Sequence, residues 1–555
     1  MKLSFVRSIA VVLLGSMLVW SCSNEPGSGK SKEALDLTKT DSGVVVEVIA
    51  TGANIAGANG VGLGPDGHLY VASVLGSNIT VLDTESGEVI KVYGLQDGVI
   101  GPDDVAFGPD GSWYWTSIMT GEVAGFDANG QRVTAAQLTP GVNPITFSDA
   151  GRLFVSQCFF GTHLFEVDPT GQEPARTISD ELGPGCGLNG MDWGPDQRLY
   201  GPRWFHQQVV SFDVDDNTMR LEASGFDTPA AIKFDKQGVL HVLDTGAGAL
   251  FKVVDGNNIQ VAELSPGLDN FVIDDQGRIF VSSFTDGFVK RINLDSSITV
   301  LQPGGMSHAG GLAYHQGDIV AADLHAIRAY KPSGEEAFTQ RNVLGTGTMG
   351  GALNVSSDGE NLVLVSWVDN DVRVWDPVAK QRVWEKAGLA APVAAVRFGD
   401  EIVVAEHGRG SVVGYAADGK ETSVYANDLA APTGLLVNGG DLFVGDRATG
   451  QILQIAAQGE ALTEARVVVT DLTTPEGFVK FQEKFAVVEA DAGQVVVVDS
   501  QGAKQVVAKV PEGSQAASPA QPPSQVFNGI TVDAKGTLFV AGESNRVLYR
   551  IANAF

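Results

Sequence analysis

Residues 189–200, Asn-Gly-Met-Asp-Trp-Gly-Pro-Asp-Gln-Arg-Leu-Tyr, have the pattern of a tight β-hairpin. A polar residue and a glycine open an apolar run, a Gly-Pro-Asp turn follows, and a second apolar run begins at Leu199. A turn of this kind between two short strand-like runs predicts a pair of antiparallel strands.

Related hairpins recur roughly every 40 residues. Each copy has a turn followed by an apolar run such as Leu-Tyr-Val or Leu-Phe-Val, and further strand-like runs come after it. The twelve copies have their turns at Gly67, Gly111, Gly151, Gln197, Gly238, Gly277, Gly317, Gly359, Asp400, Gly440, Lys484 and Gly536. Four short strands in a repeat of this length are the signature of a β-propeller blade.

Twelve blades exceed the four to eight that one propeller usually has. The sequence therefore predicts an all-β chain of two tandem six-bladed β-propellers, although a single twelve-bladed ring would also close. Because open sheet edges are unfavourable, each ring is expected to be closed by an N-terminal outer strand. Residues 44–49 would complete the sixth blade and residues 298–301 the twelfth, which predicts domains at 44–295 and 296–555.

The beginning of the chain has the pattern of a targeting segment. In residues 1–21, two basic residues precede a long apolar run, which is typical of a signal peptide. Cys22 follows a small residue, as in a bacterial lipobox, so we expect lipidation at Cys22 and a flexible linker over residues 22–43. Plain signal cleavage is the alternative, because Trp20 is unusual in that motif. Either way an exported protein is expected. With the lipid anchor it would belong to the bacterial cell envelope, at the outer membrane or facing the periplasm, and would touch the membrane only through its lipid.

The composition and net charge of the chain indicate which kinds of partner it can bind. The chain has 555 residues, 44% of them hydrophobic and 19% charged, which is typical of a folded protein. Its formal net charge of −29 repels phosphate backbones and argues against nucleic-acid binding. The same acidity could attract cations or could simply keep the protein soluble.

Two further cysteines fall between neighbouring blades. Cys158 ends the second predicted strand of blade three, and Cys186 precedes the first strand of blade four. In an oxidising compartment we expect a disulfide that fixes the loop presenting Asn189. The alternative is two unpaired cysteines packed as small apolar residues.

One position per blade should face the channel mouth, because the first strand of each propeller blade lines the central channel. In the first ring, this position is an Asn or Asp in five blades of six. The six residues are Asn59, Asp103, Asn143, Asn189, Ala230 and Asp269. Oxygen donors that converge on one axis suit a hard cation such as Ca²⁺. The alternative is that Asn and Asp occur here because they favour turns and caps.

The second ring offers fewer candidate ligands. At the equivalent positions only His308, Glu476 and Asn528 carry suitable side chains. They belong to blades seven, eleven and twelve, which are neighbours across the closure of the ring. Histidine beside a carboxylate could bind a transition metal such as Zn²⁺ or act as an acid–base pair.

The run Asn-Gly-Met-Asp-Trp at 189–193 resembles the central motif of gluconolactonases and regucalcin-like proteins. The resemblance implies six-bladed propellers with NHL-like repeats, one divalent cation in the channel and, in many members, hydrolysis of sugar lactones. It implies that Asn189 binds the metal and that Asn143 contacts the substrate or a metal-bound water. Asn59 stands where the family has a glutamate ligand.

The sequence departs from this family at the residue expected to be both ligand and base. That position is Ala230, so Asp103 and Asp269 would have to compensate as catalytic residues, with Asp269 also a ligand. In the second ring Glu476 resembles the missing motif, but its partner position is Thr433. Two functions stay open: a divalent-metal-dependent lactone or ester hydrolase, with Ca²⁺ or Zn²⁺, and a non-catalytic cell-surface propeller that binds a small molecule or a protein partner.

Overall fold

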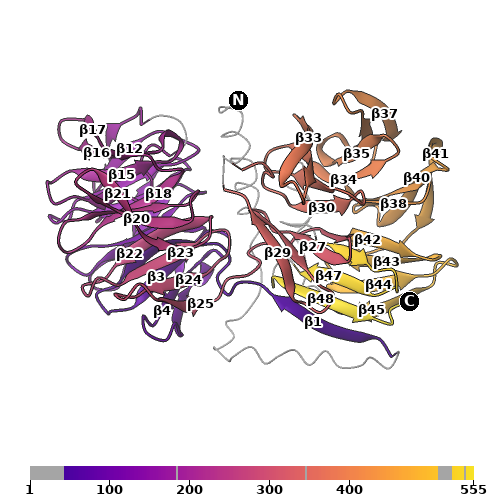
Figure 1. The fold of residues 1–555 in the computed structure, drawn as a ribbon, viewed down its shortest axis with the longest axis horizontal. Helices are drawn as coiled ribbons and strands as arrows, with labels where there is room; N and C mark the ends of the chain where they lie inside the picture. The colour runs from indigo at the N-terminus through magenta and orange to yellow at the C-terminus, as the bar shows by residue number, and fades with distance from the viewer. Residues whose placement is uncertain (1–42, 183–185, 344–346, 511–527, 543–544) are drawn as a thin grey trace. The chain divides into compact units, whose positions relative to one another are not determined.

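The computed structural model describes residues 43–182, 186–343, 347–510, 528–542 and 545–555. Within these ranges the chain forms twelve four-stranded antiparallel sheets (Figure 1) and the short 3₁₀ helices η1 (Leu95–Asp97), η2 (Trp204–His206) and η3 (His407–Arg409). No helix in them is long and apolar enough to cross a membrane. The predicted signal peptide, Cys22 and almost all of the linker lie outside the described residues.

The first compact unit covers residues 53–307 and contains six consecutive sheets. In chain order, its strands are β2 (Ala58–Leu63), β3 (Leu69–Ser73), β4 (Asn78–Leu82) and β5 (Val89–Tyr93); β6 (Pro102–Phe107), β7 (Trp113–Ser117), β8 (Glu122–Phe126) and β9 (Arg132–Gln137); β10 (Val142–Phe147), β11 (Leu153–Gln157), β12 (Leu164–Val167) and β13 (Arg176–Ser179); β14 (Asp192–Trp193), β15 (Leu199–Arg203), β16 (Gln208–Asp213) and β17 (Thr218–Ser224); β18 (Pro229–Phe234), β19 (Leu240–Asp244), β20 (Ala249–Val254) and β21 (Asn257–Glu263); β22 (Leu268–Ile273), β23 (Ile279–Ser283), β24 (Val289–Ile292) and β25 (Ile298–Gln302). The inner strands contact one another in sequence, and β22 contacts β2, so the six blades form a closed ring.

The second compact unit combines residues before 53 with residues 308–555. Its strands are β26 (Leu312–His315), β27 (Asp318–Ala322), β28 (Ala326–Tyr330) and β29 (Glu336–Arg341); β30 (Asn354–Ser357), β31 (Leu362–Ser366), β32 (Asp371–Asp376) and β33 (Gln381–Ala387); β34 (Pro392–Phe398), β35 (Glu401–Glu406), β36 (Ser411–Tyr415) and β37 (Glu421–Ala426); β38 (Pro432–Asn438), β39 (Asp441–Asp446), β40 (Gln451–Ala457) and β41 (Glu460–Val469); β42 (Pro475–Phe481), β43 (Lys484–Glu489), β44 (Gln494–Val498) and β45 (Lys504–Ala508); β46 (Ile530–Val532), β47 (Leu538–Gly542), β48 (Val547–Ala552) and β1 (Val45–Thr51). Here β26 contacts β46, which closes the second ring. The predicted pair of six-bladed propellers is therefore confirmed.

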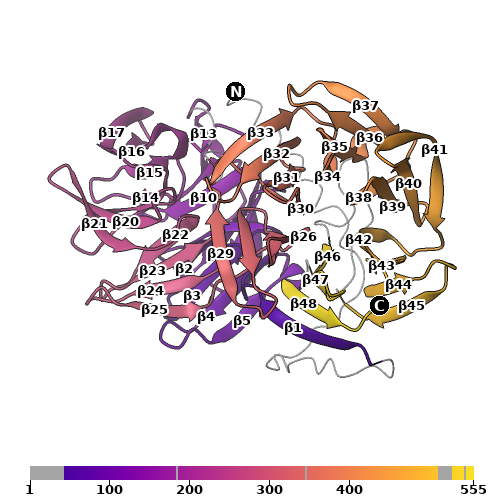
Figure 2. The same cartoon turned by 45° about the vertical axis from the view of Figure 1, so that its right-hand side comes forward.

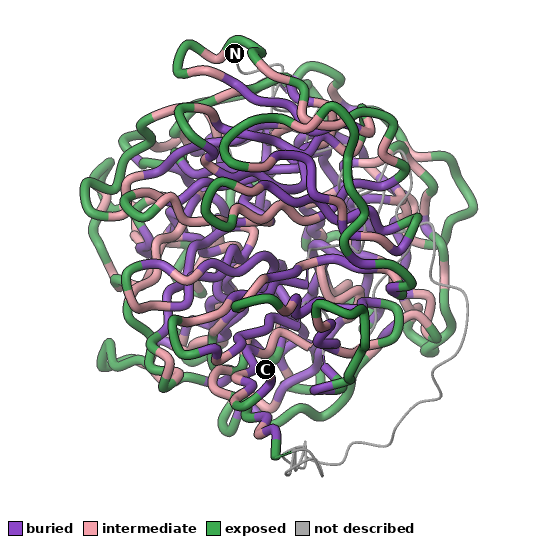
Figure 3. Tube along the Cα trace, turned by 90° about the vertical axis from the view of Figure 1, so that its right-hand side faces the viewer, coloured by how far each residue is buried: buried purple, intermediate pink, exposed green. Residues whose placement is uncertain are grey.

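Burial follows the position of a strand within its blade. The second strands, such as β3 and β7, are buried along their whole length, whereas the outermost strand β5 is largely exposed. Figure 3 shows the same gradient, with exposed segments concentrated in peripheral strands and loops. The apolar cores lie between neighbouring sheets: Tyr70 of β3, for example, packs with Val105 and Trp113 of the next blade. Each blade is therefore stable only beside its neighbours.

The predicted exchange of outer strands is wrong. Strand β25 stays in its own blade, because a short turn joins it to β24, with the Asn293 amide donating to the Ser297 carbonyl at 2.8 Å. Such a short connection keeps the hairpin local. The first ring instead closes through side chains: the Gln302 amide donates to the Gly87 carbonyl at 2.6 Å, and Arg278 and Arg291 both pair with Glu85.

Strand β1 completes the last blade of the second ring, beside β48 (Figures 1 and 2). Val46 pairs with Ile551, Glu47 forms an ion pair with Arg550, and Val46 lies in the core with Tyr549. In chain order, the first ring therefore interrupts the second: it lies between β1, which is the outer strand of the last blade of the second ring, and β26, which begins the first blade of the second ring.

Replacing Val46 by Asp should loosen the second ring alone, because it places an unpaired carboxylate in that core, at a cost on the order of 3 kcal/mol. Hydrogen exchange should become faster in β47 and β48 and stay unchanged in β23 and β24. Val300→Asp in β25 is the control, since Val300 is 54% exposed. Faster exchange confined to the sheet of β22–β25 in Val46→Asp would contradict this topology.

Candidate functional site

The predicted mouth residues of the first ring share one backbone feature. Asn59, Asp103, Asn143, Ala230 and Asp269 are each the second residue of an inner strand. In all five strands the ladder shifts register directly after the first residue, which marks a β-bulge. Bulges turn side chains away from the regular sheet direction and are frequent near functional sites. We call this end of the ring, together with Asn189, the first-ring mouth.

Two of the mouth amides are buried and partly engaged. The Asn59 Oδ1 atom accepts a hydrogen bond from the Val74 amide at 3.1 Å, which leaves it one further lone pair. Asn189 lies just before β14. Its backbone N–H donates to the Pro202 carbonyl at 3.0 Å, and its side-chain Oδ1 lies 3.8 Å from Cys158 Sγ. Asn143 is half-buried. The oxygen of Asn59 is therefore held by neighbouring backbone, and the oxygen of Asn189 lies beside Cys158.

Asp103 and Asp269 form an electrostatically coupled pair. Burial raises the pKa of Asp103 well above its ordinary value, and the negative charges of Asp269 and Asp104 raise it further. Burial also raises the pKa of Asp269 to about 8, with a further contribution from Asp104. Every one of these causes acts in the same direction. At neutral pH the pair therefore holds protons that ordinary carboxyl groups would have lost.

A second polar layer lies directly beneath the mouth. Asn270 of blade six donates to Asp104 of blade two at 3.1 Å. Blade one lies between them and has Gly60 at this level, where a Cβ would come 2.2 Å from Asp104 Oδ1. Asp104 also accepts from the Ile145 amide of blade three at 3.3 Å. Glycine at position 60 thus allows one carboxylate to connect four blades.

Lys233 supplies the positive charge of this layer. It opposes the effect of burial on Asp104, whose pKa burial nevertheless raises to about 6. It also opposes the burial that raises the pKa of Asp192. Asp192 accepts from the Phe234 amide at 2.9 Å, and Lys233 donates to the Met191 carbonyl at 2.8 Å. These contacts tie blade four to blade five, so Asp192 and Lys233 hold neighbouring blades together.

Ala230 leaves blade five without a polar side chain at the mouth. It is fully buried, and its neighbour Ala231 packs against Gly190 so closely that a Cβ on Gly190 would lie 2.4 Å from the Ala231 Cβ. The Ile232 amide donates to the Gly190 carbonyl at 2.9 Å. Small residues on both blades are required for this approach.

Cys158 and Cys186, the pair named from the sequence, form a disulfide. It joins the end of β11 to the loop that leads to Asn189, where the two cysteines also form an isolated β-bridge. Both are fully buried. The bond therefore fixes Asn189 relative to blade three.

The second-ring candidates fall into two groups. Glu476 and Asn528 lie together, because Glu476 Oε2 accepts from the Asn528 amide at 3.1 Å and from its side chain at 2.9 Å. Arg447 Nε lies 3.5 Å from Glu476 Oε1. His308 has different surroundings: its amide donates to Asp323 at 2.5 Å, and burial, with His325 and Arg546, lowers the pKa of its imidazole to about 3.

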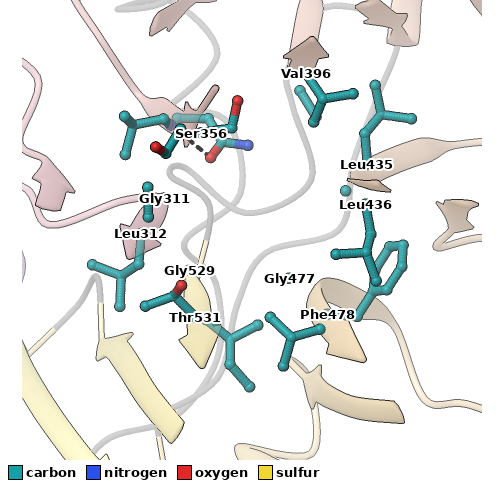
Figure 4. A pocket seen from close by; sticks show the side chains of 18 of the residues that line it. Gly311, Leu312, Ser356, Val396, Leu435, Leu436, Gly477, Phe478, Gly529 and Thr531 are labelled. Atoms are coloured by element: carbon teal, nitrogen blue, oxygen red, sulfur yellow. Dashed lines mark hydrogen bonds between the residues drawn. The ribbon is translucent and has the colours of Figure 1, made fainter. Parts of the chain in front are cut away.

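A cavity of about 240 Å³ runs along the inner strands of the second ring. Glu476 and Asn528 line it, and Figure 4 shows the apolar side chains of Leu312, Leu436 and Phe478 around it. Glu476 is already paired with Arg447 and Asn528, so its charge is balanced by the protein. The protein itself therefore compensates the negative charge at this channel.

The donor atoms of the first-ring mouth suit one kind of cation. In the described part of the chain, no three His, Cys, Asp or Glu side chains are placed to hold a metal together. The mouth gathers two carboxyl groups and amide oxygens instead. An all-oxygen set fits Ca²⁺, whereas Zn²⁺ prefers nitrogen and sulfur.

Sequence analysis missed the layer beneath the mouth. Asp104 and Asn270 directly follow the mouth residues Asp103 and Asp269, so the doublets Asp-Asp and Asp-Asn carried a usable signal. Two consecutive polar residues at the start of an otherwise apolar inner strand would place one at the mouth and one beneath it.

No protein family model matches the chain, and no curated protein matches it either. Among solved structures, one described as a streptogramin B lyase is 14% identical, with a TM-score of 0.37 over 50% of this chain and 94% of that chain. The virginiamycin B lyase of Staphylococcus aureus is 11% identical, with a TM-score of 0.36 over 50% of this chain and 96% of its own. Its catalytically inactive form with quinupristin gives the same values. This likeness concerns the propeller fold of half the chain and nothing further.

Removing the carboxyl group of Asp269 should flatten the pH dependence of stability. Its folded pKa of about 8 lies above the ordinary value of 3.8, so its contribution is complete below 3.8 and is lost as pH rises through about 8. Between about pH 5 and about pH 9, denaturant unfolding should show the wild type losing a few kcal/mol more than Asp269→Asn. Asp275→Asn is the control, since Asp275 is largely exposed. Equal losses in wild type and Asp269→Asn would contradict the buried pair.

Peptide mapping without reduction, on protein purified from an oxidising compartment, should recover residues 158 and 186 in one cross-linked species. Cys186→Ser should then release the loop that presents Asn189, and hydrogen exchange of the Asn189 amide should become faster. Two free thiols in the untreated protein would contradict the pairing.

Proposed function

We propose that the first-ring mouth is a calcium-dependent site for hydrolysis of a lactone or ester. The observation that carries this proposal is the presence at one mouth of Asp103 and Asp269, two carboxyl groups whose pKa values are raised by burial and by neighbouring carboxylates. A divalent cation is the partner that would offset both the repulsion and the burial. The amide oxygens of Asn59, Asn143 and Asn189 would complete its coordination.

The two carboxyl groups take different roles. Asp269 would ionise and join the amide oxygens as a ligand of the cation, which would supply polarisation of the substrate carbonyl group. Asp103 is the proton carrier, because it is the more deeply buried of the two. Burial and the charges of Asp269 and Asp104 raise the pKa of Asp103 above its ordinary value, which favours this carboxyl group as a proton donor and acceptor in catalysis.

Asp103 would serve both halves of the reaction. With the cation bound and Asp103 ionised, its carboxylate would accept a proton from water as the water oxygen bonds to the carbonyl carbon. It returns that proton to the ring oxygen, or the ester oxygen, as the carbon–oxygen bond breaks. Water and lactone are consumed, a hydroxy acid is formed, and Asp103 ends in its starting state. This arrangement replaces the base that is missing at Ala230.

The second candidate is a non-catalytic binding propeller for a small molecule or a surface protein. Ala230 favours it, because blade five offers neither ligand nor base and its neighbour is packed tightly against Gly190. In both cases we propose an exported lipoprotein, anchored through Cys22 to the cell envelope, as the amino-terminal pattern indicates.

Replacing Asn189 by Ala should weaken calcium binding at least about tenfold and reduce hydrolysis of simple lactones in parallel, because it removes a ligand that the disulfide holds in place. Calorimetric titration with Ca²⁺ and a lactone-hydrolysis assay on the full mature chain measure the two effects. Asn129→Ala is the matched control, since Asn129 lies in an exposed turn of the same ring.

Asp103→Asn separates the two functions. It should abolish turnover while calcium still binds, because Asp269 and the amides remain. A wild-type protein that binds no calcium and hydrolyses no lactone or ester would contradict the hydrolase proposal. Calcium binding without turnover in the wild-type protein would support the second candidate, a non-catalytic binding propeller.

A further inference from the structure

An arc of apolar side chains borders the first-ring mouth. It consists of Leu75, Met119, Phe159, Phe160, Phe205 and Phe284, which we call the mouth crescent. All six lie in loops that follow the second strand of a blade. Since the second strand runs antiparallel to the inner strand, these loops lie at the end where the inner strands begin, as the pairing of Val142 with Gln157 shows. The mouth crescent and the coupled carboxyl groups therefore share one end of the ring.

The crescent is continuous from blade six through blades one, two and three to blade four. Leu75 and Phe284 meet over Gly57, where a Cβ would lie 3.0 Å from Leu75 Cδ1 and 3.1 Å from Phe284 Cδ2. Phe160 of blade three packs on the cluster that contains Met119 of blade two and Val74 of blade one.

The arc ends on blade four. The rings of Phe159 and Phe205 meet edge to face, with centroids 6.5 Å apart. Blade five has Thr245, Gly246 and Ala247 in the corresponding loop, so the arc stops there. Ala230, the mouth residue without a polar group, belongs to the same blade. The mouth is thus bordered by apolar groups on five sides and by small residues on the sixth.

These side chains are not all absorbed into a core. Leu75, Phe160, Phe205 and Phe284 keep intermediate solvent exposure, although apolar side chains of this size are usually buried. Leucine and phenylalanine side chains carry no oxygen or nitrogen atom that could bind the hydroxyl groups of a sugar. They bind alkyl and aryl groups through loss of apolar surface from water.

We propose that the mouth crescent binds the apolar substituent of the substrate, so that the site takes alkyl- or aryl-substituted lactones and esters and not polyhydroxylated sugar lactones. The proposal rests on the proposed function of Asp103 and Asp269, which meet the polar end of the same molecule. It replaces the sugar-lactone ligand expected from the family resemblance by an amphiphilic one.

The test uses γ-lactones with unbranched alkyl side chains of increasing length, and glucono-δ-lactone, on the calcium-loaded mature chain. Affinity is measured by calorimetry, and kcat and KM are measured separately. Wild-type affinity should rise about threefold for each added methylene, and the gain should appear in KM. Phe160→Ala and Phe205→Ala should each lose about tenfold for the longest chain and little for the shortest. Phe160→Leu should retain most of the affinity.

Leu294→Ala is the matched control, because Leu294 is a 71% exposed apolar residue of the same ring, in the turn between β24 and β25. The length series on the wild type does not depend on the folding of any variant. Length-dependent binding without turnover would support the crescent and contradict the hydrolase. Turnover with no dependence on chain length, or a preference for glucono-δ-lactone, would overturn the crescent and leave the hydrolase standing.

Discussion

Close approach of neighbouring inner strands is the constraint on which both rings depend. These strands share no backbone ladder, so they meet through residues without side chains and through side-chain hydrogen bonds to the next backbone. A Cβ on Gly190 would lie 2.4 Å from Ala231, and one on Gly477 would lie 2.7 Å from the Asn528 carbonyl. Where the residue is not glycine, Asp104 and Asn354 bond to the neighbouring blade instead. Gly190, in the hairpin at residues 189–200, is therefore required for blade four to pack against blade five.

The same constraint creates the unusual chemistry of the first ring. Inner strands held this close bring the start of each strand to one narrow mouth, and the bulges there turn polar side chains out of the ladder. Asp103 and Asp269 come from blades two and six, yet the charge of Asp269 raises the pKa of Asp103, and the charge of Asp104 raises the pKa of both. The second ring uses similar geometry but balances Glu476 with Arg447 and Asn528. The same fold therefore gives two different mouths. In the first ring Asp103 and Asp269 have raised pKa values, whereas in the second ring the charge of Glu476 is balanced by Arg447.

The twelve repeats could be predicted from the sequence, because each blade contains a turn followed by an apolar run, and both are local features. It also located Asn59, Asp103, Asn143 and Asp269 at one register, since all four start inner strands. Ring closure was not predictable, because the choice of partner for β1 depends on packing against β48, more than 500 residues away in the chain. Asp104, Asn270 and the mouth crescent were missed because their significance arises only when separate blades converge.

The most direct test of the account is infrared spectroscopy of the carboxyl groups at neutral pH. The account predicts a protonated carboxylic acid band in the calcium-free protein that weakens in Asp269→Asn and weakens when calcium is added. Asp275→Asn should leave the band unchanged. A spectrum with no protonated carboxyl band at neutral pH, or a band that calcium does not affect, would contradict the claim that Asp103 and Asp269 form a protonated, calcium-binding pair at the first-ring mouth.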